Sequence, residues 1–314
     1  MIATVTLNPA VDKTLNISRL IPGTVNRASS VSNAAGGKGI NVAKVLHTFG
    51  YDVKALGFLG GYSGRLIRDS IKDYGIKEDF VRVKGQTRTS INVISEDGYV
   101  TEFLEPGPQI KKHALKKFKE TFEREAKDCD IIVISGSAPL GITSDFYAQM
   151  VQIAKAQGCK VLLDTSGDNL KKGITALPFM IKPNMKELET LMGKRIQGMQ
   201  EVAEAAEALV VRGIPHVMVS MGAKGILYAT QQKKEVSLFY VQPPGIKAVN
   251  TVGSGDAAVA AFAMAMEEKL DPVDTLKKCV AISAANTLTL ENGVVDIKEA
   301  AKIQEALSLC VPIY

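Results

Sequence analysis

The 314-residue chain is predicted to have an α/β fold, a doubly wound, mostly parallel sheet with helices on both faces. Two observations favour this class. Short apolar runs alternate with amphipathic helical stretches along most of the chain, and the runs have the continuous apolar character of strands buried on both faces. Hydrophobic residues make up 46% of the chain, which is enough for a sizeable core.

The elements follow in chain order. Strands are expected at residues 2–7, 53–58, 131–134, 161–163, 179–181 and 217–220. Helices are expected at residues 39–49, 64–74, 146–156, 188–192, 202–211, 257–266 and 272–290. Residues from about 12–34 and 87–105 break the alternation and predict a small antiparallel sheet, with a turn at Asp97-Gly98. We therefore expect one domain over residues 1–314, with the small sheet as a lid over a site.

Composition argues against several other classes. The net charge of +5 is mild, and the lysine run at 111–119 contains Leu115 and Phe118 at helical spacing, which indicates a solvated helix face and no nucleic-acid partner. The four cysteines lie far apart without a Cys-x-x-Cys pair, which argues against structural zinc. The amino-terminal apolar run is too short for a signal peptide, and no segment approaches ~20 apolar residues. A reduced, cytoplasmic protein with no membrane partner is expected.

The segment Asn-Thr-Val-Gly-Ser-Gly-Asp at residues 250–256 carries the clearest chemical signal. It places two glycines and a carboxylate where the helix over 257–266 should begin. Free backbone N–H groups of Gly253, Ser254 and Gly255 would lie at the positive end of that helix, which suits an anion. Asp256 is then either an acid that stabilises the helix dipole or a general base beside developing charge.

A second glycine-rich turn begins the helix over 39–49. Gly37 and Lys38 belong to the run Gly-Gly-Lys-Gly, and Asn41 follows one turn later. The run is not a P-loop, because it lacks the required spacing and the final Ser or Thr. It is either plain backbone geometry or a contact with an anion or a sugar.

Other candidates follow expected strands or lie in the expected lid. Asp12 could hydrogen-bond sugar hydroxyls, or act as an acid in a turn. Arg27 and Arg88 lie in the predicted lid strands, where a guanidinium could clamp a phosphate or simply be solvated. Ser137 follows the strand over 131–134, at the sheet edge where ligands of such folds bind.

Two further motifs follow later strands. Lys182-Pro183-Asn184 with Glu187 could present an amide and a carboxylate to Mg²⁺-bound phosphates, and the alternative is a helix cap with an acidic first turn. The loop Ser-Met-Gly-Ala-Lys-Gly at 220–225 follows the strand over 217–220.

Taken in order, these motifs resemble the ribokinase/PfkB carbohydrate-kinase family over essentially the whole chain, which implies a ribokinase-like fold. The opening Asn-Pro-x-x-Asp and the lysine of Gly-Gly-Lys-Gly resemble the branch that phosphorylates already phosphorylated hexoses, such as 1-phosphofructokinase and tagatose-6-phosphate kinase. Two positions depart from the common pattern. Asn250 stands where many relatives carry Asp, which bears on monovalent-cation binding, and Ser254 replaces the commoner alanine while keeping its N–H.

The resemblance also implies roles for individual residues. Asp256 would be the base, with an anion hole formed by Gly253, Ser254 and Gly255. Sugar-phosphate contacts fall on Asp12, Gly37, Lys38, Asn41 and Arg88, to which Arg27 and Ser137 are added as candidates. ATP-loop and cofactor positions are Lys182, Asn184, Ser220, Gly222, Ala223, Lys224 and Gly225. Asn184 and Glu187 would influence Mg²⁺ indirectly, through water or phosphate.

The expected activity is ATP-dependent phosphorylation of a ketohexose phosphate to a bisphosphate, with fructose 1-phosphate as first choice and tagatose 6-phosphate as alternative. Two alternatives remain: a kinase of a neutral sugar, or a non-catalytic regulator that binds a sugar phosphate. A dehydrogenase is disfavoured, because no Gly-x-Gly-x-x-Gly follows the first strand. Implied cofactors are ATP, Mg²⁺ and a monovalent cation in some relatives, and the family implies a homodimer through the lid.

Overall fold

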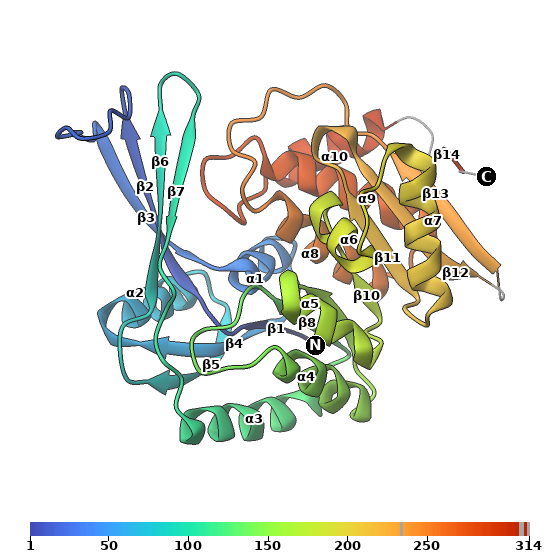
Figure 1. The fold of residues 1–314 in the computed structure, drawn as a ribbon, viewed down its shortest axis with the longest axis horizontal. Helices are drawn as coiled ribbons and strands as arrows, with labels where there is room; N and C mark the ends of the chain where they lie inside the picture. Colours follow the sequence, from blue (N-terminus) through green and yellow to red (C-terminus); the bar gives the residue numbers. More distant parts are fainter. Residues whose placement is uncertain (233–234, 308–310, 313–314) are drawn as a thin grey trace.

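A computed structural model describes residues 1–232, 235–307 and 311–312. Its main sheet has ten strands in the order β14-β13-β12-β11-β10-β9-β8-β1-β4-β5 (Figure 1). Their bounds are β1 (Ile2–Thr6), β4 (Val53–Gly60), β5 (Lys77–Val83), β8 (Ile131–Ser135), β9 (Lys160–Asp164), β10 (Met180–Ile181), β11 (His216–Ser220), β12 (Ile226–Gln232), β13 (Glu235–Val241) and β14 (Val311–Pro312). From β5 to β11 all neighbours are parallel, whereas β12, β13 and β14 extend the sheet in antiparallel fashion.

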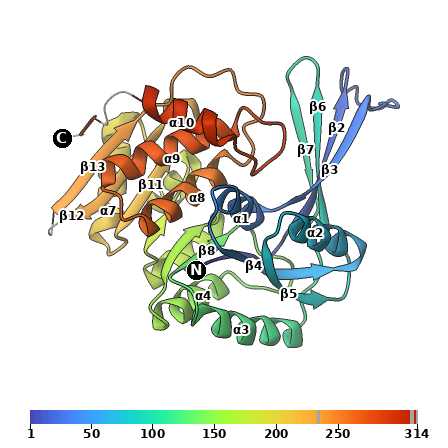
Figure 2. The same ribbon diagram turned by 180° about the vertical axis from the view of Figure 1, so that it is seen from behind.

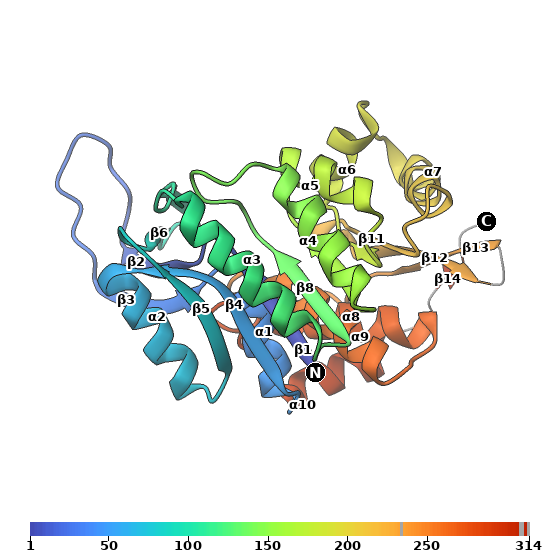
Figure 3. The ribbon, with the colours of Figure 1, turned by 90° about the horizontal axis from the view of Figure 1, so that it is seen from below.

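Helices cover both faces of this sheet, as Figure 3 shows from below. One core cluster contains residues of α1 (Lys38–Thr48), α2 (Gly61–Asp73), α8 (Ser254–Glu267), α9 (Pro272–Asn286) and α10 (Ile297–Ala306). The other contains residues of α3 (Lys112–Ala126), α4 (Asp145–Ala156), α5 (Gly167–Gly173), α6 (Met185–Met192) and α7 (Gly198–Val211). The predicted doubly wound fold is confirmed.

The central helix α8 explains how a deep site is built. Its residues from Asp256 to Ala265 are all buried, and most are alanines, so the neighbouring helices α1 and α9 can approach closely. Small side chains also give strong helix propensity without a polar face. The amino terminus of α8 is thereby held inside the molecule, where it can act on a ligand.

A second sheet stands apart from the main one, upright in Figures 1 and 2. Its order is β3-β2-β6-β7, with β2 (Ala10–Ile17), β3 (Ser30–Gly36), β6 (Arg88–Ser95) and β7 (Val100–Leu104). These strands fall within or beside the expected ranges 12–34 and 87–105, but the sheet is not wholly antiparallel as expected, because β2 and β6 run parallel. Gly98 lies in the turn between β6 and β7 with a φ of 86°, a conformation that favours glycine.

Several elements escaped the sequence-based prediction. Strands β5, β12 and β13 and helices α5 and α10 were not expected, and the helix predicted over 272–290 ends at Asn286 in the structure. Within the described ranges, we find no helix with the length and apolar character needed to cross a bilayer.

Candidate active site

A cavity of about 780 Å³ lies where the second sheet faces the carboxyl ends of the main strands. Its walls come from β2, β6 and β7 of the second sheet, from the turns that begin α1 and α8, and from the loops after β10 and β11. This is the expected place for a ligand in an open parallel sheet.

The beginning of α8 forms the floor of this cavity. Gly253 precedes the helix with a φ of 85°, which L side chains rarely adopt, and Ser254 and Gly255 open its first turn. A side chain at position 255 would meet the Lys182 ammonium, since a Cβ there would lie 3.0 Å from Nζ. The turn therefore presents its N–H groups to the cavity with a buried cation beside them, an arrangement that favours an anion.

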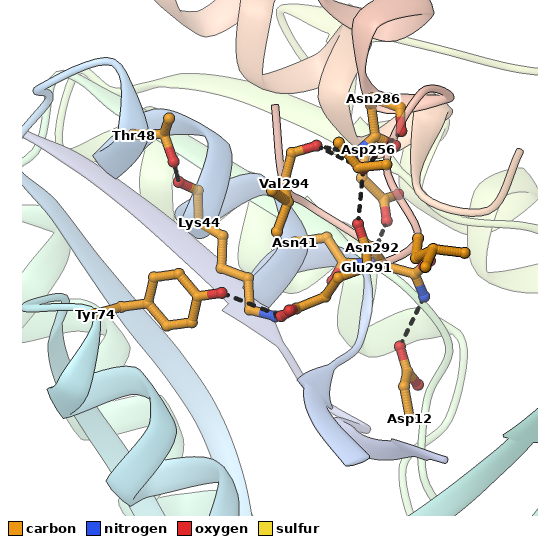
Figure 4. A network of polar contacts seen from close by, with 12 residues as sticks. Asp12, Asn41, Lys44, Thr48, Tyr74, Asp256, Asn286, Glu291, Asn292 and Val294 are labelled. Atoms are coloured by element: carbon orange, nitrogen blue, oxygen red, sulfur yellow. Dashed lines mark hydrogen bonds and ion pairs between the residues drawn. The ribbon is translucent and has the colours of Figure 1, made fainter. Parts of the chain in front are cut away.

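Asp256 lies in the first turn of α8 and is only 5% exposed. Asn41 of α1 donates a hydrogen bond from Nδ2 to Asp256 Oδ2 at 2.8 Å (Figure 4). Burial raises the pKa of Asp256 to about 6 against the attraction of Lys38, with the Asp164 carboxylate adding to the rise. A carboxylate with such a pKa is a suitable proton acceptor near neutral pH.

Two lysines flank the buried carboxylate of Asp164, at the end of β9. Lys38 Nζ lies 3.2 Å from Asp164 Oδ2, and Lys182 Nζ lies 3.4 Å from Oδ1. Burial opposes ionisation of Asp164, but Lys182 and Lys38 outweigh it and hold its pKa below the ordinary value. Burial likewise opposes the charge of Lys38, and the carboxylates of Asp164 and Asp256 nevertheless raise its pKa. Both lysines line the cavity.

Asp12 faces the cavity from β2, within the second sheet. Asn292 donates a hydrogen bond from Nδ2 to Asp12 Oδ2 at 2.9 Å (Figure 4). Asn250 in turn donates to Asn292 Oδ1 at 3.0 Å. Burial raises the pKa of Asp12, and the Asn292 hydrogen bond acts in the opposite direction.

Arg88 begins β6 and lines the same side of the cavity. Its Nε donates a hydrogen bond to the backbone oxygen of Asn8 at 3.1 Å, which fixes the guanidinium at the base of the second sheet. Asn8 also bonds Ser137 Oγ at 3.4 Å, so Ser137 lies near this corner although it does not line the cavity. Burial lowers the pKa of Arg88 against the attraction of Asp12.

Asn184 and Glu187 both line the cavity, and they also form a capping box at the start of α6. The Glu187 N–H donates to Asn184 Oδ1 at 3.0 Å, and the Asn184 N–H donates to Glu187 Oε2 at 2.8 Å. The capping alternative raised by the sequence is thus present in the structure, alongside exposure of the same pair to the cavity.

The structure brings most of the sequence-predicted site residues to one cavity. Those lining it are Asp12, Gly37, Lys38, Asn41, Arg88, Lys182, Asn184, Glu187, Ser220, Gly222, Ala223, Gly225, Gly253, Ser254, Gly255 and Asp256. Arg27, Ser137 and Lys224 are outside this lining. The expectation that Arg27 lies in a strand was wrong, because it occupies the exposed loop between β2 and β3.

Sequence reasoning missed several residues of the cavity. Asp164 was not predicted as a site residue, although a carboxylate that ends an apolar strand was a usable signal. Asn292 carried no signal, because its place beside Asp12 depends on a contact across 280 positions of sequence. An apolar wall was also unforeseen: it includes Pro243, Pro244, Ile246, Val280 and Ala284.

Comparison with known proteins agrees with this geometry. The family model described as pfkB family carbohydrate kinase matches residues 3–294. The chain belongs to this family. A tagatose-6-phosphate kinase of Staphylococcus epidermidis is 38% identical over 296 residues, covering 93% of this chain and 94% of that relative.

Solved structures of pfkB-type kinases superpose closely on the chain. Phosphofructokinase-2 of Escherichia coli, in complex with substrates and products, has a TM-score of 0.90 at 28% identity and covers 98% of this chain and 99% of its own. A protein described as a possible 1-phosphofructokinase from Thermotoga maritima has a TM-score of 0.90 at 26% identity, with full coverage of both chains. The pfkB protein is therefore a phosphotransferase with a ribokinase-like fold.

Proposed function

We propose that this pfkB protein transfers the γ-phosphoryl group of MgATP to the free primary hydroxyl of a ketohexose phosphate, giving a bisphosphate. Fructose 1-phosphate and tagatose 6-phosphate are the two substrates that the relatives' names favour equally. The observation that carries the proposal is the buried Asp256 at the floor of a cavity that also holds Lys38 and Arg88. The carboxylate would accept the proton of the hydroxyl, and the cations would bind phosphate groups.

Asp256 is the proposed general base. The acceptor hydroxyl loses its proton late in phosphoryl transfer, and the Asp256 carboxylate receives it while Asn41 holds Oδ2 in place. The N–H groups of Gly253, Ser254 and Gly255 would face the charge on the transferring group's peripheral oxygens. Because the transition state is loose, such positioning and electrostatics account for most of the catalysis.

The sugar phosphate is proposed to lie between β2, β6 and α1. Asp12 and Asn41 would bind hydroxyls, while Lys38 and Arg88 would bind the phosphate. Gly37 lines the same turn, where a side chain would collide with Thr6. Arg27 and Ser137 remain candidates outside the cavity lining.

Residues on the opposite side of the cavity fit a nucleotide. MgATP supplies the phosphoryl group when it is bound. The apolar wall at Pro243, Ile246 and Val280 suits a purine ring, and the loop with Ser220, Gly222, Ala223 and Gly225 lies beside it. Lys182 lies near the anion turn, and Lys224 stays a prediction from the loop motif. Glu187 and Asn184 would act on Mg²⁺ through water or phosphate, since the capping box already uses both side chains.

A monovalent cation remains a prediction from the family. The Asn250 side chain accepts from the Val252 N–H at 3.0 Å and donates to Leu290 O and Asn292 Oδ1. A cation would therefore depend on oxygens other than Asn250 Oδ1.

An ADP-release assay with fructose 1-phosphate, tagatose 6-phosphate, fructose 6-phosphate, fructose and ribose tests the activity. We expect a higher kcat/KM with the three sugar phosphates than with fructose or ribose, because only a phosphorylated sugar uses both cations of the site, and the highest value with one of the first two. Highest kcat/KM with fructose or ribose would point to a neutral-sugar kinase. Ligand-induced thermal stabilisation without ADP release would point to a regulator.

We also propose that the protein forms a homodimer through its second sheet. Paired residues Val31, Leu15 and Val93 share one face of that sheet, as do Ile91 and Phe103. Val31 on β3 and Phe103 on β7, the two edge strands of that sheet, are each 53% exposed, although both are large apolar side chains. A second copy of the same face would cover them.

A further inference from the structure

A chain of side-chain hydrogen bonds joins the two ends of the cavity. Asp12 Oδ2 accepts from Asn292 Nδ2 at 2.9 Å, and Asn292 Oδ1 accepts from Asn250 Nδ2 at 3.0 Å. Asn250 Oδ1 accepts from the N–H of Val252 at 3.0 Å. Val252 directly precedes Gly253, so the carboxylate on the second sheet is connected to the anion turn of α8.

We propose that Asn292 is a positioning residue. It fixes the Asp12 carboxylate toward the sugar hydroxyls and aligns it with the turn of α8 that faces the transferring phosphoryl group. The inference rests on the proposed kinase function and adds a residue that its sequence motifs do not contain. Asn292 suits the task because its amide donates to a carboxylate and accepts from an amide at once. A side chain without both groups would break the chain at its centre.

The loop that carries Asn292 is held rigidly against α1. Gly293 has a φ of 74°, and a Cβ there would lie 2.9 Å from Asn41 Cα, so this position requires glycine. Glu291 accepts from the buried Lys44 at 3.0 Å and from the Tyr74 hydroxyl at 3.1 Å (Figure 4). Asn292 is therefore fixed on both sides, as a residue that orients another must be.

The electrostatics of Asp12 make such orientation useful. Lys44 of α1 and Arg88 of β6 attract its carboxylate, whereas Glu102 of β7 repels it. Burial raises the pKa of Asp12, and the Asn292 hydrogen bond is the largest influence that opposes the rise. Without Asn292, Asp12 would lose both a directional partner and the strongest support for its ionised form.

Asn292→Ala tests the proposal through the Michaelis constants for the two substrates. With fructose 1-phosphate or tagatose 6-phosphate, whichever the wild type uses, we expect KM for the sugar to rise ~10-fold. KM for ATP should stay within about twofold, because the chain orients Asp12 and leaves the apolar wall intact. Loss of structure alone would not produce this difference between the two Michaelis constants.

A double-mutant cycle with Asp12→Ala separates positioning from a general structural role. If Asn292 acts through Asp12, adding Asn292→Ala to Asp12→Ala should change kcat/KM by less than about twofold. Full additivity of the two losses would overturn the proposal. Asn292→Ser, which is shorter but polar, provides the same comparison if the alanine variant does not fold.

Asn16→Ala is the matched control. Asn16 lies on the same strand as Asp12 and donates to Ser30 Oγ at 2.8 Å, away from the cavity lining. Its removal should leave both KM values within about twofold. An active wild type with an unchanged sugar KM in Asn292→Ala overturns the positioning role alone, whereas a wild type without ADP release or calorimetric binding of any tested sugar overturns the proposed function as well.

Discussion

At the scale of single residues, Asp256 combines burial with a neighbouring cation, and this combination has a pH signature. Its pKa is raised to about 6 by burial, so the carboxylate needed for proton transfer is lost below that pH. We expect kcat/KM to fall about tenfold per pH unit below 6 and to level off above it. A profile that stays flat to pH 5 would contradict the assignment of Asp256 as base.

Asp256→Asn should separate activity from stability. The pKa of this group is higher in the folded protein than the value near 4 of an unfolded chain, so its burial favours folding at low pH and disfavours it above about pH 6. At pH 7.5 the ionised Asp256 lowers the free energy of unfolding by up to about 3 kcal/mol. The variant should therefore unfold at a higher urea concentration than the wild type while kcat falls ~10²–10⁴-fold. Near-normal turnover in the folded variant would exclude Asp256 as the general base.

Arg88→Ala should weaken sugar-phosphate binding. Loss of a charge-assisted hydrogen bond of ~1.5–3 kcal/mol predicts a rise of roughly tenfold or more in KM for the sugar phosphate, with little change in KM for ATP. Steady-state kinetics at saturating ATP measure the effect. An unchanged KM would mean that another cation clamps the phosphate, or that the substrate carries none.

The anion turn at 253–255 and the carboxylate of Asp256 could be predicted from the sequence, because both features depend on residues that are neighbours in the sequence. Glycines before a helix and a carboxylate in its first turn are local signals. Asn292 and Asp164 act through partners that lie far away in the sequence, so no local spacing pairs them with those partners. The part of the site that escaped prediction is the part that tertiary packing creates.

At the scale of elements, the ion triad of Asp164, Lys38 and Lys182 joins β9 to the start of α1 and the loop after β10. Because the folded state lowers the pKa of Asp164, the carboxylate stabilises the protein above pH 4 and loses that contribution as pH falls through the folded pKa. Asp164→Asn leaves Lys182, only 5% exposed, without its counter-charge. We expect this variant to have a free energy of unfolding about 3 kcal/mol lower than the wild type at pH 7, measured by urea unfolding.

Asp168→Asn is the control for that experiment, since Asp168 is 83% exposed and lies 4.0 Å from Lys171. This substitution should change the free energy of unfolding by no more than about 0.5 kcal/mol. Equal stability of the two variants would show that the triad is solvated enough to need no counter-charge.

The elements themselves were predicted unevenly, for physical reasons. Parallel strands such as β1 and β8 are buried on both faces and therefore have continuous apolar runs. Strand β13 is mostly half-buried and was missed despite its apolar run at 238–241, and β5 begins with the charged stretch Lys77-Glu78-Asp79. Helix α10 was missed although Asp296 caps its first turn, because its apolar face is short.

At the scale of the whole molecule, the second sheet uses its two faces differently. Asp12, Ser90 and Leu104 occupy paired positions on the face that lines the cavity, whereas Val31 and Phe103 are exposed on the other. A sheet with ligand contacts on one face and apolar side chains on the other is stable only if the second face is also covered. The resulting expectation is that assembly and sugar binding depend on the same four strands.

Phe103→Asp tests this coupling. A charge within the proposed contact should shift the protein from dimer to monomer in light scattering coupled to size exclusion. Because the contact would also hold β7, and with it Glu102 and Leu104, in place against the cavity, KM for the sugar phosphate should rise in the monomer while KM for ATP changes little. The Tyr99→Asp variant, altered at an exposed position directly before β7 begins, should keep both the dimer and the KM for the sugar phosphate. A wild-type monomer with full activity would show instead that the four strands close over the sugar without a partner.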